Sequence, residues 1–562
     1  MLVAAVAAIL AVGLAACGGG SSSSSSSPST SEGGSAESES EGGGEAEGGG
    51  SEGGTLKGAY TSFPDYMDPQ ISYTAEGWTA MRPVYIPLLT YKAASEEEGA
   101  EIIPGLAKEL PKVTNGGKTY TLFLREGLKY SNGEPIKAGD FKYAVERAFL
   151  TNSGGSPFYT DIVGAEKFAE TKKGGIPGIK VNEKTGEIVI NLENPRGTFN
   201  NELALMFVAP VPQSTPDEDQ SASPIPASGP YMITKSEPGR GWDYERNPYW
   251  AKDNGKEIEI PAGHVDKIEI EVQRNQSTQV NDVESGKLNW IFDPPPTDRY
   301  QEVKEKFEGT QFRPEPTIST YYFWMNQSQE PFNNLKVREA VNYAVDPAAL
   351  ERIYTGQIVG TQQILPPGMP GYKKLELFPH DVKKAKELVA ESGVKDKEIT
   401  VWTDTESPNN DAGTYYQGVL EEIGFKVELK ILNPDNYFTV IGNTSTPNLD
   451  TGFADWFEDY PHPNDFMFLL NGENIQSTNN QNFSQTNVKA LNEKVNKLSE
   501  EQLGPEQEAG YTELDEEFMK EAAWAPYGTR TLSLFVSENI NLETAIWNPT
   551  FETELTSLEF TE

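Results

Sequence analysis

The chain has 562 residues and a formal net charge of −39, with 85 acidic residues against 46 basic ones. This balance argues against a nucleic-acid partner, because a phosphate-binding surface needs clustered lysine and arginine. The length exceeds what one hydrophobic core usually holds, so several lobes are expected, and the strong net charge favours a monomer.

The first sixteen residues, Met1 to Ala16, are uncharged and almost wholly apolar. They fall short of the roughly 20 residues that a helix needs to cross a bilayer. The pattern predicts a cleaved signal peptide over residues 1–16, although the basic residues that usually open such a signal are missing before Lys57. An unusually short membrane span is the alternative.

Cys17 is the only cysteine of the chain and directly follows this segment. The stretch Leu14-Ala15-Ala16-Cys17 resembles the bacterial lipobox, whose cysteine is diacylated and becomes the mature N-terminus. Two acyl chains hold a protein stably on a membrane. We therefore expect Cys17 to be lipidated and to anchor the protein at the extracytoplasmic face of the bacterial cell membrane.

Residues 18–55 consist almost entirely of Gly, Ser, Glu and Ala and contain no Lys or Arg. Such a segment has too little apolar surface to offset the entropy lost on ordering it. Residues 17–55 are therefore predicted to form a lipidated, disordered linker ahead of the folded part.

The first regular elements of the folded part are expected between residues 119 and 150. Tyr120, Leu122 and Leu124 alternate with residues that face the other way, which predicts a strand. Asn132-Gly133 predicts a turn, and a helix is expected to begin near Asp140. That helix would share one apolar face made by Phe141, Ala144, Val145, Ala148 and Phe149.

The remaining elements show mixed α and β structure without regular alternation. A hairpin is expected at residues 179–192, turning at Lys184 to Gly186. Asp346-Pro347 is a typical helix start and Gly393 a typical helix end. Further strands are predicted at 267–272, 317–325 and 426–432, and further helices at 335–345, 347–354, 381–392 and 511–523.

Signals for catalysis or metal binding are poor. The three histidines, His264, His380 and His462, lie far apart and have no recognisable zinc spacing. No phosphate-binding loop of the G-x-x-x-x-G-K-[ST] type occurs in the sequence. We expect no enzyme activity, no metal and no cofactor.

Five segments, taken in order, resemble one family, the extracytoplasmic solute-binding proteins of ABC importers in the oligopeptide, dipeptide and nickel-binding class (solute-binding family 5). Any one match could arise by chance, but the order of all five makes chance a poor explanation. The segments are Phe63 to Gln70 (FPDYMDPQ), Pro104 to Arg147 (with SNGEP and AGDF), Ala227 to Trp250 (with GPY and RNPYW), Tyr321 to Asp346 (with PF and VREA) and Asp455 to Leu470 (with WFEDY).

The resemblance implies an α/β fold of the type II periplasmic-binding-protein (Venus-flytrap) class. Two lobes would be joined by a two-strand hinge, and a third lobe would be an accessory. The expected boundaries are 56–95, 198–310 and 525–562 for lobe I, 96–197 for accessory lobe II, and 311–524 for lobe III.

The resemblance also implies ligand-binding residues. In peptide-binding members, the acidic residue of the W-x-x-D-Y motif accepts the α-ammonium group of the ligand, and this role carries over to Asp459. An ammonium taken out of water needs such a carboxylate partner. Trp456 and Tyr460 flank Asp459, and Tyr322 and Trp324 are further candidate contacts from the aromatic run.

The leading interpretation is a lipid-anchored substrate-binding subunit of an ABC importer. It would capture oligopeptides by cleft closure and deliver them to the permease, whose transmembrane subunits work with cytoplasmic ATPases. The alternative is the same fold binding an oligosaccharide or another small solute, since a chain rich in aromatic residues can also stack on sugars. A cell-surface hydrolase is a remote alternative.

Overall fold

The computed structural model describes residues 50–51, 53–395 and 397–561. The predicted signal peptide, Cys17 and most of the predicted linker lie outside the described residues. The end of the linker prediction is wrong, because β1 (Gly50–Ser51) pairs with β22 (Phe560–Thr561) and β2 (Thr55–Tyr60) already begins at Thr55. The ring of Phe560 lies against Gly54, an apolar partner from the other end of the chain that local composition does not reveal.

A twelve-stranded mixed sheet forms the frame of the fold, in the order β17-β16-β18-β14-β19-β12-β2-β11-β10-β9, with β13 and β15 also paired to β19. β2 is parallel to β11 and β12, and β16 is parallel to β17 and β18. Besides β2, its strands are β9 (Tyr231–Glu237), β10 (Gly241–Arg246), β11 (Lys267–Val272), β12 (Trp290–Ile291), β13 (Phe312–Pro316), β14 (Ser319–Met325), β15 (Ile358–Val359), β16 (Glu398–Asp404), β17 (Lys426–Leu432), β18 (Thr451–Phe457) and β19 (Trp524–Val536).

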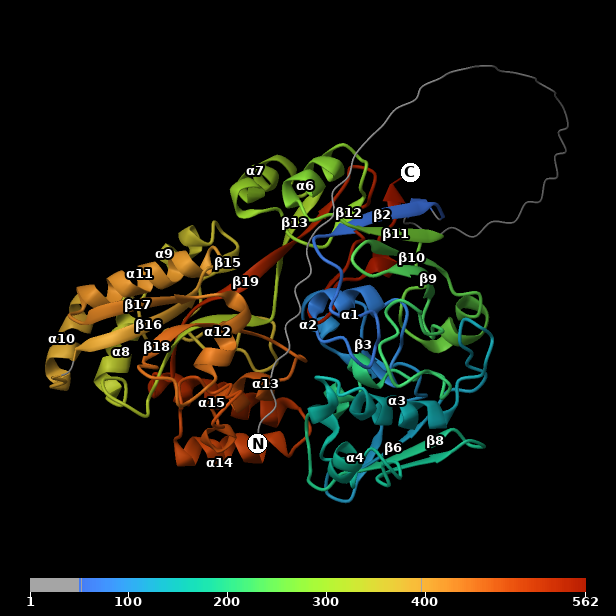
Figure 1. Ribbon diagram of the computed structural model, residues 1–562, viewed down its shortest axis with the longest axis horizontal. Helices are drawn as coiled ribbons and strands as arrows, with labels where there is room; N and C mark the ends of the chain where they lie inside the picture. The colour runs from blue at the N-terminus through green and yellow to red at the C-terminus, as the bar shows by residue number, and fades with distance from the viewer. Residues whose placement is uncertain (1–49, 52, 396, 562) are drawn as a thin grey trace, which may run out of the picture. The chain divides into compact units, whose positions relative to one another are not determined.

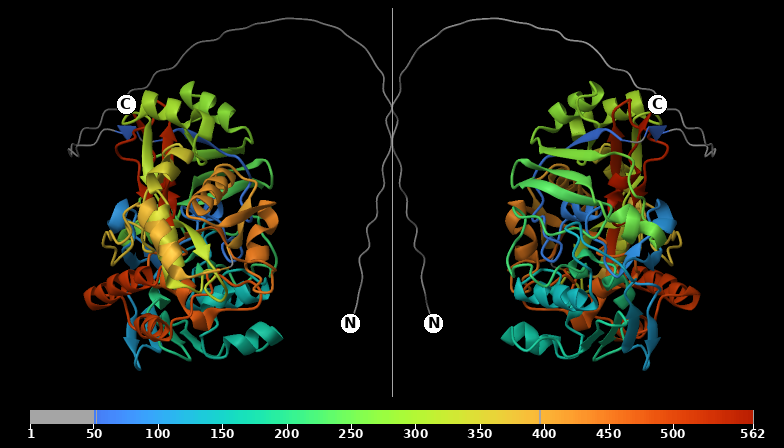
Figure 2. Two further views of the ribbon diagram at one scale, coloured as in Figure 1. Left: turned by 90° about the vertical axis from the view of Figure 1, so that its left-hand side faces the viewer. Right: turned by 90° about the vertical axis from the view of Figure 1, so that its right-hand side faces the viewer.

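The long strand β19 belongs to both halves of this sheet (Figure 1). Its first residues pair with β14, whereas its last residues pair with β13 and β12. The chain crosses a second time between β13 and β14, where Thr317 N donates to Arg530 O at 3.0 Å. Two adjacent strand segments therefore connect the halves, and both views of Figure 2 show red C-terminal segments reaching up to the light-green helices at the top.

Smaller sheets surround the frame. The expected hairpin is confirmed. The predicted alternation is confirmed as well, and the side shared by Tyr120 and Leu122 is the buried one. The four-stranded antiparallel sheet is β5 (Lys112–Thr114), β6 (Thr119–Phe123), β8 (Glu187–Asn191) and β7 (Ile179–Asn182). The two-stranded pairs are β3 (Leu89–Tyr91) with β4 (Ile102–Pro104), and β20 (Trp547–Asn548) with β21 (Glu552–Thr553).

None of the described helices is long and apolar enough to span a membrane. They are α1 (Ala75–Met81), α2 (Glu96–Gly99), α3 (Ala138–Leu150), α4 (Ala165–Thr171), α5 (Phe199–Glu202), α6 (Gln276–Glu284), α7 (Thr297–Phe307), α8 (Leu335–Ala344), α9 (Pro347–Ile353), α10 (Val382–Ser392), α11 (Asn409–Glu422), α12 (Pro434–Ile441), α13 (Asn464–Met467), α14 (Lys489–Ser499) and α15 (Pro505–Lys520).

Two helix boundaries predicted from capping residues are confirmed, and one predicted helix is shifted. Asp346 caps α9 by accepting a hydrogen bond from Ala348 N, and Gly393 ends α10 in the left-handed conformation. The helix expected at 511–523 is shifted, since α15 begins at Pro505 after Gly504 and ends at Lys520. A positive φ at Ala522 and the start of β19 at Trp524 stop it early.

The hydrophobic interior divides at the two crossing segments. One cluster of buried apolar residues draws on residues 56–290 and 534–558, with Tyr460 added from the far side of the crossing. A second cluster draws only on residues 318–527. The four-stranded sheet shares the first cluster, so the region expected as accessory lobe II is not separated from residues 56–95 by its own core.

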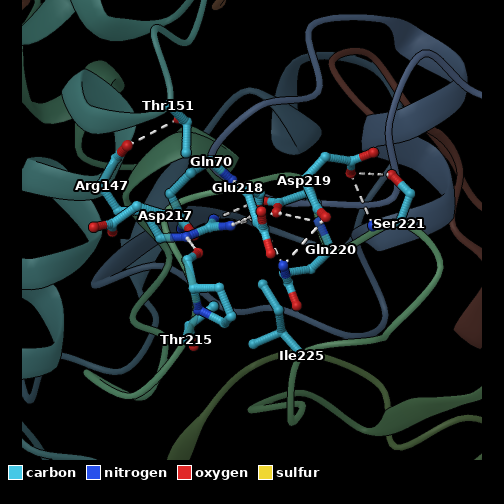
Figure 3. Close-up of polar contacts among 12 residues, drawn as sticks. Gln70, Arg147, Thr151, Thr215, Asp217, Glu218, Asp219, Gln220, Ser221 and Ile225 are labelled. Atoms are coloured by element: carbon cyan, nitrogen blue, oxygen red, sulfur yellow. Dashed lines mark hydrogen bonds and ion pairs between the residues drawn. The ribbon is translucent and has the colours of Figure 1, made fainter.

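A buried ion pair joins two of the sequence segments noted above (Figure 3). Arg147, on α3, donates to both carboxylate oxygens of Asp68 at 2.6 Å and to Gln70 Oε1 at 2.8 Å. It also donates to the carbonyl oxygens of Pro216 and Glu218, both at 2.8 Å. This cluster fastens the loop that leads to α1 against α3.

Candidate functional site

The predicted W-x-x-D-Y motif lies at the end of β18, directly beside the strand crossing. β18 is paired with β14 along its whole length, from Thr451 opposite Met325 to Phe457 opposite Ser319. Glu458 N continues this ladder by donating to Ile318 O at 3.1 Å. Asp459 follows where the ladder ends, so its side chain is free to face the other half of the molecule.

Asp459 makes a hydrogen bond across the two halves. Tyr73 Oη, in the loop before α1, donates to Asp459 Oδ1 at 2.9 Å. The Tyr73 ring stacks on Trp78 at a centroid distance of 5.8 Å and contacts the edge of Phe207. Asp459 Oδ2 accepts no hydrogen bond from the described residues, so half of this carboxylate is available to a ligand.

Asp465 fixes the loop that carries Asp459 through two hydrogen bonds. Its Oδ2 accepts hydrogen bonds from Asp459 N at 2.9 Å and from Trp456 Nε1 at 3.2 Å. Burial raises the pKa of Asp459 to about 6, and burial together with the neighbouring charge of Asp459 raises the pKa of Asp465 well above its usual range. A cationic group at Asp459 would offset this penalty on the charged carboxylate.

A cavity of about 180 Å³ opens beside Asp459. It adjoins a larger cavity of about 870 Å³, with which it shares Thr317 of the crossing segment and Pro549. The smaller cavity is lined by Tyr73, Thr74, Ala75, Trp78, Thr317, Phe457, Glu458, Asp459, Pro549, Thr550 and Glu552. These residues come from both sides of the strand crossing, so the cavity is a cleft between the two halves.

The second edge of β18 is available for pairing near this cleft. β18 pairs with β16 only at Thr451 and Gly452, and the Tyr437 hydroxyl contacts Phe453 O at 2.6 Å where the two strands part. The backbone N–H and C=O groups of alternate residues point to opposite edges of a strand, so those of Asp455 and Phe457 point away from β14. No strand of the described chain pairs with these two residues at that outer edge. An extended ligand can add to a free edge of this kind.

The structure places the predicted site residues in three different surroundings. Of the five predicted residues, only Asp459 lines the cleft. Trp456 donates a hydrogen bond to Asp465, the residue that also accepts from Asp459 N. Tyr460 is 4% exposed and contacts the edge of Phe158 in the first core cluster.

The expectation of ligand contacts at Tyr322 and Trp324 does not agree with where these residues lie. Tyr322 is 1% exposed and stacks on Trp524, and Trp324 is 0% exposed and donates through Nε1 to Phe453 O. Every residue of β14 is buried, because this central strand is covered on both faces. Both side chains therefore belong to the core of residues 318–527.

Sequence reasoning missed Tyr73, Glu458 and Glu552 at the cleft. Glu458 could have been found from its place next to Asp459 in the motif. Tyr73 and Glu552 carry no such signal, since they lie almost 480 residues apart in the sequence and meet only in the folded chain.

In the described part of the chain, no group of three or more His, Cys, Asp or Glu side chains is arranged to hold an ion. His462 is buried, and burial lowers its pKa to about 3. Its Nδ1 accepts a hydrogen bond from Asn464 N at 3.1 Å, so it serves the loop structure.

These features define an α/β solute-binding protein, in which two halves joined by paired strand segments enclose a cleft. Residues 101–478 match the family model of bacterial extracellular solute-binding proteins, family 5, and the chain belongs to this family. The predicted family and the predicted type II two-lobe fold are thereby confirmed.

Relatives with assigned roles are binding proteins. The oligopeptide-binding protein OppA of Bacillus subtilis is 25% identical over 437 residues, which cover 73% of this chain and 76% of the relative. The periplasmic oligopeptide-binding protein OppA of Salmonella typhimurium is 26% identical over 384 residues, covering 64% and 68%.

Solved structures share the fold. Clavulanic acid biosynthesis oligopeptide binding protein 2 has a TM-score of 0.83 at 22% identity, covering 91% of this chain and 96% of the other. DppA from Helicobacter pylori, in complex with the peptide STSA, has a TM-score of 0.69 at 20% identity, covering 91% and 99%.

Proposed function

We propose that this protein is the substrate-binding subunit of an ABC importer and that it captures oligopeptides with a free N-terminus. The observation that carries the proposal is the Asp459 carboxylate, which lines a cleft between the two halves and has one oxygen without a donor among the described residues. The names of the relatives support a peptide as the ligand class.

The ligand's ammonium group would bind at Asp459. Taking an ammonium out of water is costly unless a carboxylate receives it, and a charge-assisted hydrogen bond supplies this partner. The peptide backbone would continue along the free edge of β18 at Asp455 and Phe457, leaving its side chains to the adjoining cavities. Because backbone groups provide much of this binding, peptides of different sequence would be accepted.

Closure would couple binding to delivery. The cleft is lined from both halves, so a ligand touching both makes contacts that exist only in the closed form. Only this difference in affinity can shift the population toward closure. The permease would then recognise the closed form and receive the peptide.

The lobes would be those implied by the family resemblance, with boundaries at 56–95, 198–310 and 525–562, at 96–197, and at 311–524. The strand crossings at Thr317 and Arg530 lie five or six residues beyond the predicted boundaries at 311 and 525, and we place the hinge there.

Acylation of Cys17 would hold the protein on the outer face of the cell membrane, after removal of residues 1–16 as a signal peptide. The proposal also includes a monomeric state, since the importer's partner in this scheme is the permease alone. Mass spectrometry of the purified native protein tests the modification, with a diacylated Cys17 at the N-terminus as the expected result.

Oligosaccharide binding is the second candidate, because Tyr73, Trp78 and Phe457 bring aromatic rings to the same cleft. A neutral sugar would leave the Asp459 carboxylate without a cationic partner. The carboxylate therefore favours peptides over sugars.

Isothermal titration calorimetry with tri-alanine and its N-acetylated form tests the proposal. We expect tri-alanine to bind, and acetylation or the variant Asp459→Asn to weaken binding about 10- to 100-fold, the range for a hydrogen bond to a charged group. Asp411→Asn, an exposed residue of α11, makes the same charge change outside the cleft and should leave binding as it is. Equal affinity for free and acetylated peptide would overturn the assignment of Asp459, and binding of an oligosaccharide instead would overturn the peptide assignment.

A further inference from the structure

More carboxyl groups line the cleft beside Asp459 than one ammonium group can pair with. Glu458, Asp459 and Glu552 all line the cavity of about 180 Å³, and its lining contains no Lys, Arg or His. The peptide's N-terminus accounts for Asp459 alone. The other two carboxylates need their own explanation.

Glu552 lies opposite the motif, in the short strand β21. Its backbone has a φ of 56°, in the left-handed region that non-glycine residues seldom adopt. Within the described chain its carboxylate accepts no hydrogen bond and pairs with no cation. Burial and the neighbouring charges of Glu76 and Asp293 raise its pKa to about 8, so the charged form of this carboxylate needs a cationic partner, which the cavity lining does not supply.

Two buried polar atoms without partners belong to residues lining the same cavity. Thr550 is 8% exposed, and its Oγ1 makes no hydrogen bond to the described residues. Glu458 Oε1 is likewise buried without a partner. Buried polar atoms are nearly always satisfied in native proteins, so this part of the cavity wall lacks hydrogen-bond partners from the described chain.

A metal ion does not explain this arrangement. No three acidic side chains of the described residues are close enough together to hold an ion. Separate carboxylates on opposite walls of a cavity suit separate cationic groups on one organic ligand.

We infer that the cavity is a subsite for a basic side chain, and that the protein prefers peptides whose first residue is lysine or arginine. This inference rests on the proposed function, in which the ammonium group of the same residue binds Asp459. The side-chain cation would bind Glu552 from one wall and Glu458 from the other. Neutral peptides would still bind through Asp459 and the edge of β18.

Calorimetric titration with Lys-Ala-Ala and norleucine-Ala-Ala tests this subsite, because the two peptides differ only in the terminal amine of the first side chain. In the wild type, Lys-Ala-Ala should bind at least about tenfold tighter, as expected for one additional charge-assisted pair. Glu552→Gln should reduce this ratio to about threefold or less, and Glu458→Gln should reduce it in the same direction.

The control is Glu543→Gln, an exposed residue of the same C-terminal segment, which makes the same charge change and should keep the tenfold ratio. Thermal unfolding of each variant verifies that it is folded. A wild-type ratio near one, or a ratio that survives in both Glu552→Gln and Glu458→Gln, would overturn the subsite while tri-alanine binding upholds the proposed function. If none of the peptides binds, both proposals are overturned.

Discussion

Replacing Arg147 by methionine removes the centre of the buried polar cluster between α3 and the loop before α1. The guanidinium group makes two hydrogen bonds of 2.6 Å to Asp68 and three of 2.8 Å to Gln70, Pro216 and Glu218. Methionine fills much of the volume of the arginine stem but donates no hydrogen bond.

The expected loss of stability follows from the Asp68 carboxylate that remains buried without its partner. Arg147 and Asp68 are both 0% exposed, so the variant leaves a buried carboxylate with only the backbone N–H groups of Gln70 and Gln220 as donors. Removing one partner of a buried ion pair costs about 3–5 kcal/mol. Adding Asp68→Asn removes the stranded charge, and the double variant should recover at least about 1 kcal/mol relative to the single one.

Guanidinium chloride unfolding, followed by tryptophan fluorescence, measures these differences. Arg352→Met is the control, because Arg352 is 72% exposed and its ion pair with Asp346 spans 3.9 Å, so we expect a loss below about 0.5 kcal/mol. A loss for Arg147→Met no larger than that of the control would show that the cluster does not stabilise the fold. A double variant as unstable as the sum of the two singles would show that no charge is left stranded.

Two further outcomes concern the half formed by residues 318–527. Asp515 is 2% exposed and burial raises its pKa to about 7, so the folded state keeps a proton that the unfolded chain releases near pH 4. The free energy of unfolding should therefore fall as the pH rises between about 4 and 7. Unfolding measured across that range should show a flatter slope for Asp515→Asn. A slope unchanged by the substitution would assign it to other groups. Tyr322→Ala removes a ring stacked on Trp524 in the core, so it should destabilise the protein by about 3–5 kcal/mol. The folded variant should keep its peptide affinity within about threefold. A larger change in affinity would place Tyr322 at the ligand.

Local signals in the sequence predicted individual elements well. The strands at 267–272 and 426–432 have the predicted bounds, and the capping residues Asp346 and Gly393 act where predicted. These features depend on side-chain alternation and on backbone groups a few residues apart, which the sequence displays directly.

Properties that depend on tertiary packing could not be predicted from the sequence. The aromatic run in β14 shows no alternation, because neighbouring strands and covering helices bury both of its faces, and so the run gave no indication of which side meets a ligand. The motif located Asp459, whereas Glu552 and Tyr73 come from distant parts of the sequence and reach the cleft only in the folded chain. The pairing of Gly50–Ser51 with the last strand likewise depends on residues at the opposite end of the chain.

Closure of the two halves on a peptide held through its N-terminus can be observed by small-angle X-ray scattering of the folded part, residues 50–562, with and without peptide. We expect saturating tri-alanine to reduce the radius of gyration of the wild type, and N-acetylated tri-alanine at the same concentration to leave it unchanged. The Asp459→Asn variant should remain open with either peptide. Equal compaction by both peptides, or scattering that no peptide alters, would be incompatible with an ammonium-anchored closure.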